Sequence, residues 1–310
     1  WLGSFRSSDE RLNRIFETAV RTVHLCCQEY LWDGIKRDRL VWIGDLHPEA
    51  MAVLNVFGAA PVLRETFDYS IAVTPPDVWM NTMPTYTLWW LRDLAAWFRF
   101  TGDVGYLARH ADYVERTFDH VIAGFGADGR WTAGNFLDWP TKHNVPATWA
   151  GLQGLMTLTM REGAEMLSAA GDTEASKACA QALERLRLYV PETFGSKQAA
   201  ALLALSGLAQ PEEMYRDVLG RGGSGGAGRL QGAADGQGDA RVHRLSQVGE
   251  APEGHSGRTS AYHRAGALLV DGGAICRRRQ LPVPRTGSAV HLTRPGGTVW
   301  SIREWKRIVC

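Results

Sequence analysis

The chain has few cysteines and no long apolar run, and both absences narrow the class of protein it can be. Its 310 residues contain only Cys26, Cys27, Cys179, Cys276 and Cys310. This odd, scattered set has no CxxC pair, which argues against a disulfide framework or a zinc site. It suits a reducing compartment or indifference to redox state. No apolar run approaches the roughly 18 residues of a membrane span, so we expect no membrane partner.

The sequence also lacks the usual marks of a chain start and of a cofactor site. It opens Trp1-Leu2-Gly3-Ser4-Phe5, without an initiating Met or a secretory signal, so we expect a fragment of a longer protein. The sequence does not determine the localisation, although the cytoplasm is slightly favoured. It does not determine the oligomeric state either. No phosphate-binding loop or ligand cluster is present, so we expect no cofactor and no metal.

Lysine and acidic residues are scarce in the last part of the chain. Residues 220–310 hold 13 Arg but one Lys, six Asp and Glu, and 18 of the 34 Gly, while residues 1–219 carry a net charge of −7. This composition predicts a poorly ordered tail. A GC-rich coding sequence that is read out of frame tends to yield Gly, Arg, Ala and Pro. We therefore favour an aberrant, frameshifted tail over a natural disordered extension. Arg scattered among Gly without a fold motif gives too little support for a nucleic-acid partner.

What the sequence does contain, over residues 8–215, is apolar spacing of three and four residues. This spacing predicts eight amphipathic helices and no competing strands. Their expected ranges are 8–23, 48–55, 64–71, 85–100, 104–122, 147–170, 173–189 and 196–208. Helix pairs joined by alternating short and long loops indicate an all-α toroid with its site on the long-loop rim.

Three carboxylates, several cations and an indole crowd into residues 33–45, DGIKRDRLVWIGD. Carboxylates beside Arg and Lys can be held in different protonation states, and a sugar ring stacks on an indole face. A charged, solvated loop is the plain alternative. Trp42 and Ile43 are poorly suited to such a loop, which favours a site.

This segment resembles the signature of the α-L-rhamnosidase-like glycoside hydrolases, inverting enzymes whose catalytic domain is an (α/α)6 barrel. Further matches cover about residues 5–220 and comprise Met83–Trp90, Phe98–Asp103, Asn135–Pro140 and Ser196–Ala201. The resemblance implies a partial barrel domain over 1–219, followed by the 220–310 tail. A full barrel of six hairpins needs about twelve helices.

The resemblance also implies roles for individual residues. Asp38 stands where the family's general acid, usually a Glu, is found, and a salt bridge with Arg37 or Arg39 is the alternative. Candidate substrate-binding residues are Asp33, Arg37, Trp42, Asp45, Trp89, Asp138 and Trp139. For Asp33, Arg37 and Asp45 the alternative is capping or ion pairing in the loop. For Asp138 it is an N-cap or a loop hydrogen bond, and for the indoles it is core packing.

The family's general base, the Glu of a Thr-Thr-x-Trp-Glu type segment, has no match in this sequence. The nearest text, residues 297–304, differs in spacing, so we transfer no role to Glu304. We expect a rhamnoside-like carbohydrate substrate and inverting hydrolysis of terminal α-L-rhamnosides, with only the acid half of the site present. The alternative is an inactive fragment or a non-catalytic carbohydrate-binding α/α domain.

Overall fold

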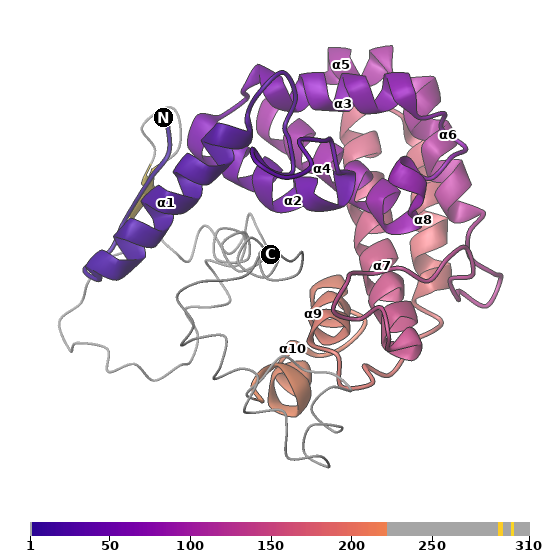
Figure 1. Cartoon of the computed structure of the whole chain (residues 1–310). Coiled ribbons are helices and arrows are strands. Elements are labelled where there is room, and N and C mark those ends of the chain that lie inside the picture. Colours follow the sequence, from indigo (N-terminus) through magenta and orange to yellow (C-terminus); the bar gives the residue numbers. More distant parts are fainter. Residues whose placement is uncertain (1, 222–290, 294–298, 301–310) are drawn as a thin grey trace. The chain divides into compact units, whose positions relative to one another are not determined.

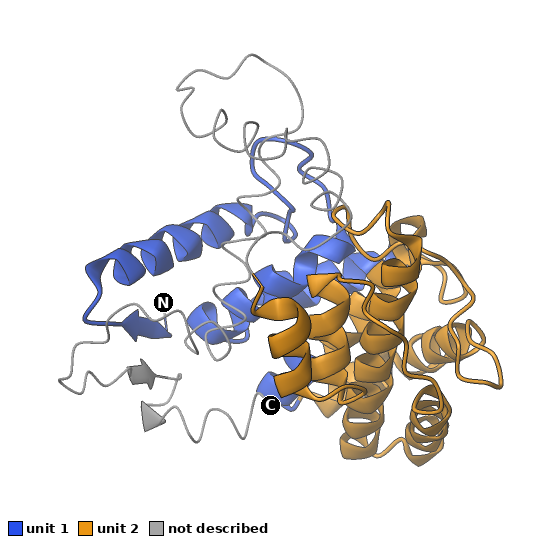
Figure 2. Ribbon diagram, turned by 90° about the horizontal axis from the view of Figure 1, so that it is seen from below, with its two compact units in different colours: residues 1–73, 96–102, 255–310 blue, residues 74–95, 103–254 orange. Residues whose placement is uncertain are grey.

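The computed structural model describes residues 2–221, together with the short segments 291–293 and 299–300. These residues are mostly helical, which confirms the all-α prediction (Figure 1). They divide into two compact units, shown in different colours in Figure 2. Unit 1 comprises residues 1–73, 96–102 and 255–310, and unit 2 comprises 74–95 and 103–254. The predictions for the tail fall almost wholly outside the described residues.

Unit 1 is built on three helices and a short sheet. Its helices are α1 (Glu10–Cys26), α2 (Ile43–Ala52) with the π-helical turn Val53–Phe57, and α3 (Pro61–Val73). Strand β1 (Ser4–Arg6) pairs antiparallel with β2 (His291–Thr293), which pairs antiparallel with β3 (Val299–Trp300). Val20, Leu54 and Phe67 are fully buried in this unit.

A buried hydrogen bond joins α3 to the segment that leads into the charged motif. The Leu31 amide donates to the Thr66 hydroxyl on α3 at 2.9 Å, and that hydroxyl donates to the Val62 carbonyl at 2.7 Å. Since Leu31 and Thr66 are both buried, no solvent replaces this contact. The bond therefore fixes the chain just before the motif.

Unit 2 is organised around α7. It contains η2 (Met80–Thr82), the first part of α4 (Pro84–Thr101), α5 (Val104–Arg109), α6 (Ala111–Ile122), α7 (Val145–Ala170), α8 (Thr173–Leu186), α9 (Lys197–Ser206), α10 (Pro211–Met214) and the π-helical turn Tyr215–Leu219. Helix α7 packs against both α8 and α9 (Figure 1). It is buried on all sides from Ala147 to Met160 apart from Trp149, as expected for a central helix.

Local sequence explains where these helices begin and end. Asp103, Asn144, Asp172 and Ser196 accept a hydrogen bond from a first-turn amide of α5, α7, α8 and α9 respectively. Gly171 and Gly207 close α7 and α9 with φ of 91° and 79°, a region that disfavours residues with a Cβ.

Three details of the predicted helices were wrong. The first helix begins at Glu10 rather than at residue 8, and Asp9 caps it by accepting the Arg11 amide. Helix α2 begins at Ile43, so Pro48 lies inside it rather than in its first turn. The predicted helix 104–122 is two helices, because His110 has φ −110° and ψ 15°. Apolar spacing continues through His110 and does not mark the start of α2, so it reveals neither boundary.

Candidate functional site

The motif segment forms a closed loop ahead of α2 in unit 1. The Asp33 amide donates to the Leu40 carbonyl, and the Leu40 amide donates to Asp33 Oδ1, both at 3.0 Å. Arg39 turns the chain with a φ of 55°. These contacts hold the two ends of the loop together and leave Arg37 and Asp38 between them.

Asp38, the predicted general acid, is held by two neighbours. Arg37 donates from Nε to Oδ1 at 3.0 Å and from Nη2 to Oδ2 at 2.8 Å, and Trp42 Nε1 donates to Oδ2 at 3.1 Å. The hydrogen bond from Arg37 is the main cause that lowers the pKa of Asp38. The predicted alternative, a salt bridge with Arg37, is therefore present in this state.

The pKa of Asp33 is shifted in the opposite direction to that of Asp38. Partial burial raises its pKa, an effect that the Leu40 amide partly offsets and the nearby charge of Asp38 reinforces. Two carboxyl groups of one loop thus differ in the direction of their shifts, as in sites that need one protonated and one ionised group. In this state Asp33 retains a proton more readily than Asp38 does.

Trp42 and Asp45 lie at the start of α2. Trp42 occupies the N-cap position and is half-buried, and its indole N–H is engaged by Asp38. Asp45 is in the first turn, where a negative charge interacts favourably with the helix dipole. The pKa of Arg37 is raised mainly by Asp38 and further by the charges of Asp33 and Asp45, so these four charged groups share one region.

The remaining predicted residues belong to unit 2. Asp138 Oδ1 accepts hydrogen bonds from the amide of buried Thr141, at 2.8 Å, and from its hydroxyl. This is the loop hydrogen bonding that was the alternative for Asp138. Trp139 is 58% exposed, with the ring of Phe136 at 5.3 Å and Lys142 Nζ 5.0 Å from its ring centre. Of the predicted indoles, Trp139 offers the most open surface to a ligand.

Trp89 is half-buried beside an ion pair. The Arg92 guanidinium lies 5.0 Å from its ring centre, and Arg92 makes two 3.0 Å hydrogen bonds to Glu162 on α7. The indole face under Arg92 is therefore not open to a sugar. This geometry favours a packing role for Trp89.

An aromatic cluster in unit 2 was not predicted from the sequence. Trp79 lies 3.9 Å from the His120 ring and 5.9 Å from the Trp131 ring, centre to centre. Burial lowers the pKa of His120, against the opposing charge of Asp77. Trp79 stands just before the Met83–Trp90 match, which was the one available signal.

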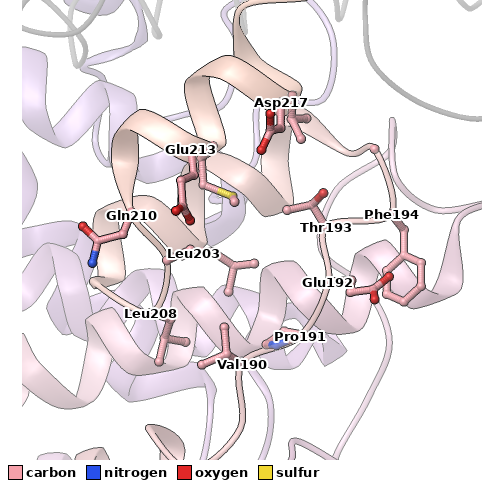
Figure 3. A pocket seen from close by; sticks show the side chains of 14 residues that line it. Val190, Pro191, Glu192, Thr193, Phe194, Leu203, Leu208, Gln210, Glu213 and Asp217 are labelled. Carbon is pink, nitrogen blue, oxygen red and sulfur yellow. The ribbon is translucent and has the colours of Figure 1, made fainter.

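Unit 2 also contains a pocket of about 590 Å³, which is lined by residues from the part of the sequence between Val190 and Val218 (Figure 3). Leu203, Leu208 and Pro191 contribute apolar surface, and Glu213 and Asp217 contribute carboxylates. None of the predicted site residues lines it.

Among the residues that the structure describes, no group of three or more His, Cys, Asp and Glu side chains is arranged to hold a metal ion. In the same residues, no helix combines the length and apolar character of a membrane span.

The sequence pattern of the bacterial α-L-rhamnosidase six-hairpin glycosidase domain matches residues 1–151. The chain carries an α-L-rhamnosidase-like six-hairpin glycosidase domain. The match includes the loop of Asp33 and Asp38 and the segment of Asp138 and Trp139. The resemblance drawn from the sequence is thus confirmed for the domain family.

Two solved structures have the same fold as this rhamnosidase-like domain. The GH78 rhamnosidase of Bacillus sp. GL1 is 23% identical with a TM-score of 0.55, covering 69% of this chain and 26% of its own. The rhamnosidase from Klebsiella oxytoca with rhamnose bound is 18% identical with a TM-score of 0.57, covering 79% of this chain and 55% of its own. The chain thus spans about a quarter and about half of their lengths. No curated protein matches.

Proposed function

We propose that this domain carries the acid half of an inverting glycosidase site that acts on terminal α-L-rhamnosides. The observation that carries the proposal is the grouping of Asp33, Arg37, Asp38, Trp42 and Asp45 in one short segment of a rhamnosidase-like domain. Three carboxylates, a guanidinium and an indole are the groups that recognise sugar hydroxyls and a sugar ring.

Each residue has a distinct part in the proposed reaction. Asp38, once protonated, gives its proton to the glycosidic oxygen as the bond to the anomeric carbon breaks. Asp33 and Asp45 accept hydrogen bonds from sugar hydroxyls, and Arg37 donates one. Water attacks the opposite face of the ring, activated by a second carboxylate about 6.5–9.5 Å from the first.

We assign that second carboxylate, the general base, to no residue of this chain. Glu304 lies outside the described residues, and the spacing around it differs from the family's base segment. A missing base removes a typical factor of about 10²–10⁴ in rate. We therefore expect no measurable hydrolysis by this chain in water, and rhamnose binding with a millimolar Kd at best, about 4 kcal/mol.

Trp139 and Asp138 are the proposed substrate contacts from unit 2, because Trp139 is largely exposed and Asp138 is adjacent to it. Trp89 is the weakest of the proposed contacts, since Arg92 covers one of its faces. The Klebsiella oxytoca rhamnosidase, whose structure has rhamnose bound, supports rhamnose as the sugar.

A non-catalytic carbohydrate-binding domain is the second candidate, favoured by the hydrogen bonds that keep Asp38 ionised in this state. It predicts the same sugar binding but no role for a proton on Asp38. A test of turnover that bypasses the base therefore separates the two candidates.

The proposal is tested by NMR saturation transfer from the chain to L-rhamnose, with L-fucose and D-mannose as matched sugars. We expect transfer to rhamnose at millimolar concentration, and a loss of at least tenfold in affinity for Asp33→Asn and for Asp45→Asn. Absence of transfer to rhamnose, or equal transfer to all three sugars, would contradict the proposed specificity.

A further inference from the structure

The two carboxylate oxygens of Asp38 have different hydrogen-bond partners. Arg37 contacts both oxygens, whereas Trp42 contacts only Oδ2. Oδ2 accepts from both Arg37 Nη2 and Trp42 Nε1, whereas Arg37 Nε is the donor to Oδ1. Removal of Arg37 would leave Oδ2 held by Trp42 and would free Oδ1. A carboxyl group in that condition can bind a proton on Oδ1 without losing its orientation.

Arg37 is placed so that it can leave. Its side chain is 67% exposed, against 29% for Asp38. An ion pair at this exposure is weak enough to exchange for another partner. Asp33 and Asp45 already interact with the charge of Arg37, so its guanidinium need not return to water alone when it leaves Asp38.

The rest of the loop is built to stay in place during such a change. The paired Asp33 and Leu40 hydrogen bonds fix the loop ends. Trp42 is held at the N-cap of α2, where its carbonyl accepts the Asp45 amide at 3.0 Å. The moving part is thereby limited to the side chain of Arg37. A local rearrangement of one exposed side chain needs no change in the fold.

We propose that Arg37 is a substrate-operated gate on Asp38: it occupies the carboxylate in the empty site and moves to a sugar hydroxyl when the sugar binds, after which Asp38 Oδ1 takes up one proton from solvent. This rests on the proposed function. Arg37 is a positioning residue here, since it acts on the reaction through the protonation of Asp38. The gate keeps the acid ionised until a sugar is present.

The charged groups around Asp38 define what the test must control. Arg37 and Trp42 contact it directly, Asp33 interacts with it through its charge, and Asp45 acts on Arg37. Arg39, the next residue, is exposed and provides a matched control of the same charge and type.

The test uses the full chain with ¹⁵N-labelled tryptophan, and follows the Trp42 indole N–H signal while pH is lowered. Because that N–H donates to Asp38, its shift reports the protonation of the carboxyl. Trp42→Phe assigns the signal, and Asp38→Asn should remove the titration. Arg37→Gln should raise the midpoint by about one pH unit or more without sugar, whereas Arg39→Gln should leave it unchanged. Arg37→Lys, which keeps the charge without the paired hydrogen bonds, should give a smaller rise.

Saturating L-rhamnose should raise the midpoint of the native chain by a similar amount and leave that of Arg37→Gln unchanged. If rhamnose shifts other signals but leaves the Trp42 midpoint unmoved, the gate is overturned while the proposed function stands. If rhamnose shifts no signal, the sugar is not the ligand, and the gate fails with the proposed function. An unmoved midpoint in sugar-free Arg37→Gln would overturn the gate independently of any sugar.

Discussion

Arg37 makes a paired ion contact with the residue that follows it, Asp38, through both carboxylate oxygens at 3.0 and 2.8 Å. Adjacent residues of a helix or strand point in different directions, so such a pair needs the irregular loop in which the two are found. The contact lowers the pKa of the candidate acid and so favours its ionised form. Any account of catalysis must therefore explain how the contact opens.

A first prediction concerns the hydrogen bond that positions the motif. Thr66→Val keeps the side-chain volume but removes the acceptor of the buried Leu31 amide, which should cost about 1–3 kcal/mol of folding free energy. Urea unfolding followed by circular dichroism measures the loss. The control is Thr22→Val on α1. The Thr22 hydroxyl donates to the Thr18 carbonyl within the same helix, and its loss should change stability by less than about 0.5 kcal/mol.

The close approach of α7 and α9 gives a second prediction. A Cβ at Gly154 would lie 2.7 Å from the Leu202 backbone carbon, so Gly154→Ala should destabilise unit 2 by about 1–3 kcal/mol. At Gly105 in α5 the nearest atom would lie at 3.4 Å, and there Ala should be neutral or stabilising by up to about 1 kcal/mol. Equal unfolding midpoints for the two variants would contradict the packing described for α7.

Two cysteines provide a prediction about pH. Burial raises the pKa of both Cys27 and Cys179 to about 12, from an ordinary value of 9.0. Their thiols should remain protonated at pH 9 in the folded chain and react with iodoacetamide at least tenfold more slowly than in urea. Peptide mass spectrometry after timed labelling measures each residue separately.

The same shifts set the direction of a stability change. Above pH 9 the unfolded chain releases these thiol protons while the folded chain keeps them, so the unfolded state is favoured. The contribution of these two thiols to folding stability is complete below pH 9 and is lost as the pH rises toward 12. A thermal midpoint that rises between pH 9 and 10.5 would contradict this sign.

Much of the helical content follows from the sequence, because apolar spacing reflects burial on one face. The helices α4, α7 and α9 lie within three residues of their predicted ranges. The break at His110 and the early start of α2 at Ile43 leave no trace in that spacing. They depend on backbone angles and tertiary packing, which the apolar pattern does not encode.

For the candidate site too, the sequence predicts some features and the structure alone shows others. The domain family is confirmed, and the sequence predicts the candidate site residues of the Asp33–Asp45 segment. It does not reveal that the pKa of Asp38 is lowered, that Asp138 is bonded to Thr141, or that Trp89 lies under Arg92. These are properties of side-chain geometry, in which a hydrogen bond to a carboxylate shifts its pKa.

The central claim, that Asp38 is the proton donor of an inverting site without its base, is tested most directly with azide. Azide attacks the anomeric carbon without losing a proton, so it replaces the base-activated water while the leaving oxygen still needs a proton. With methyl α-L-rhamnoside, we expect the chain to form β-L-rhamnosyl azide and methanol in azide and to form no rhamnose in its absence. Asp38→Asn should lower that rate by about 10²–10⁴, and Asp38→Glu should retain it. Equal rates for the native chain and Asp38→Asn, or an α-configured azide product, would contradict the account.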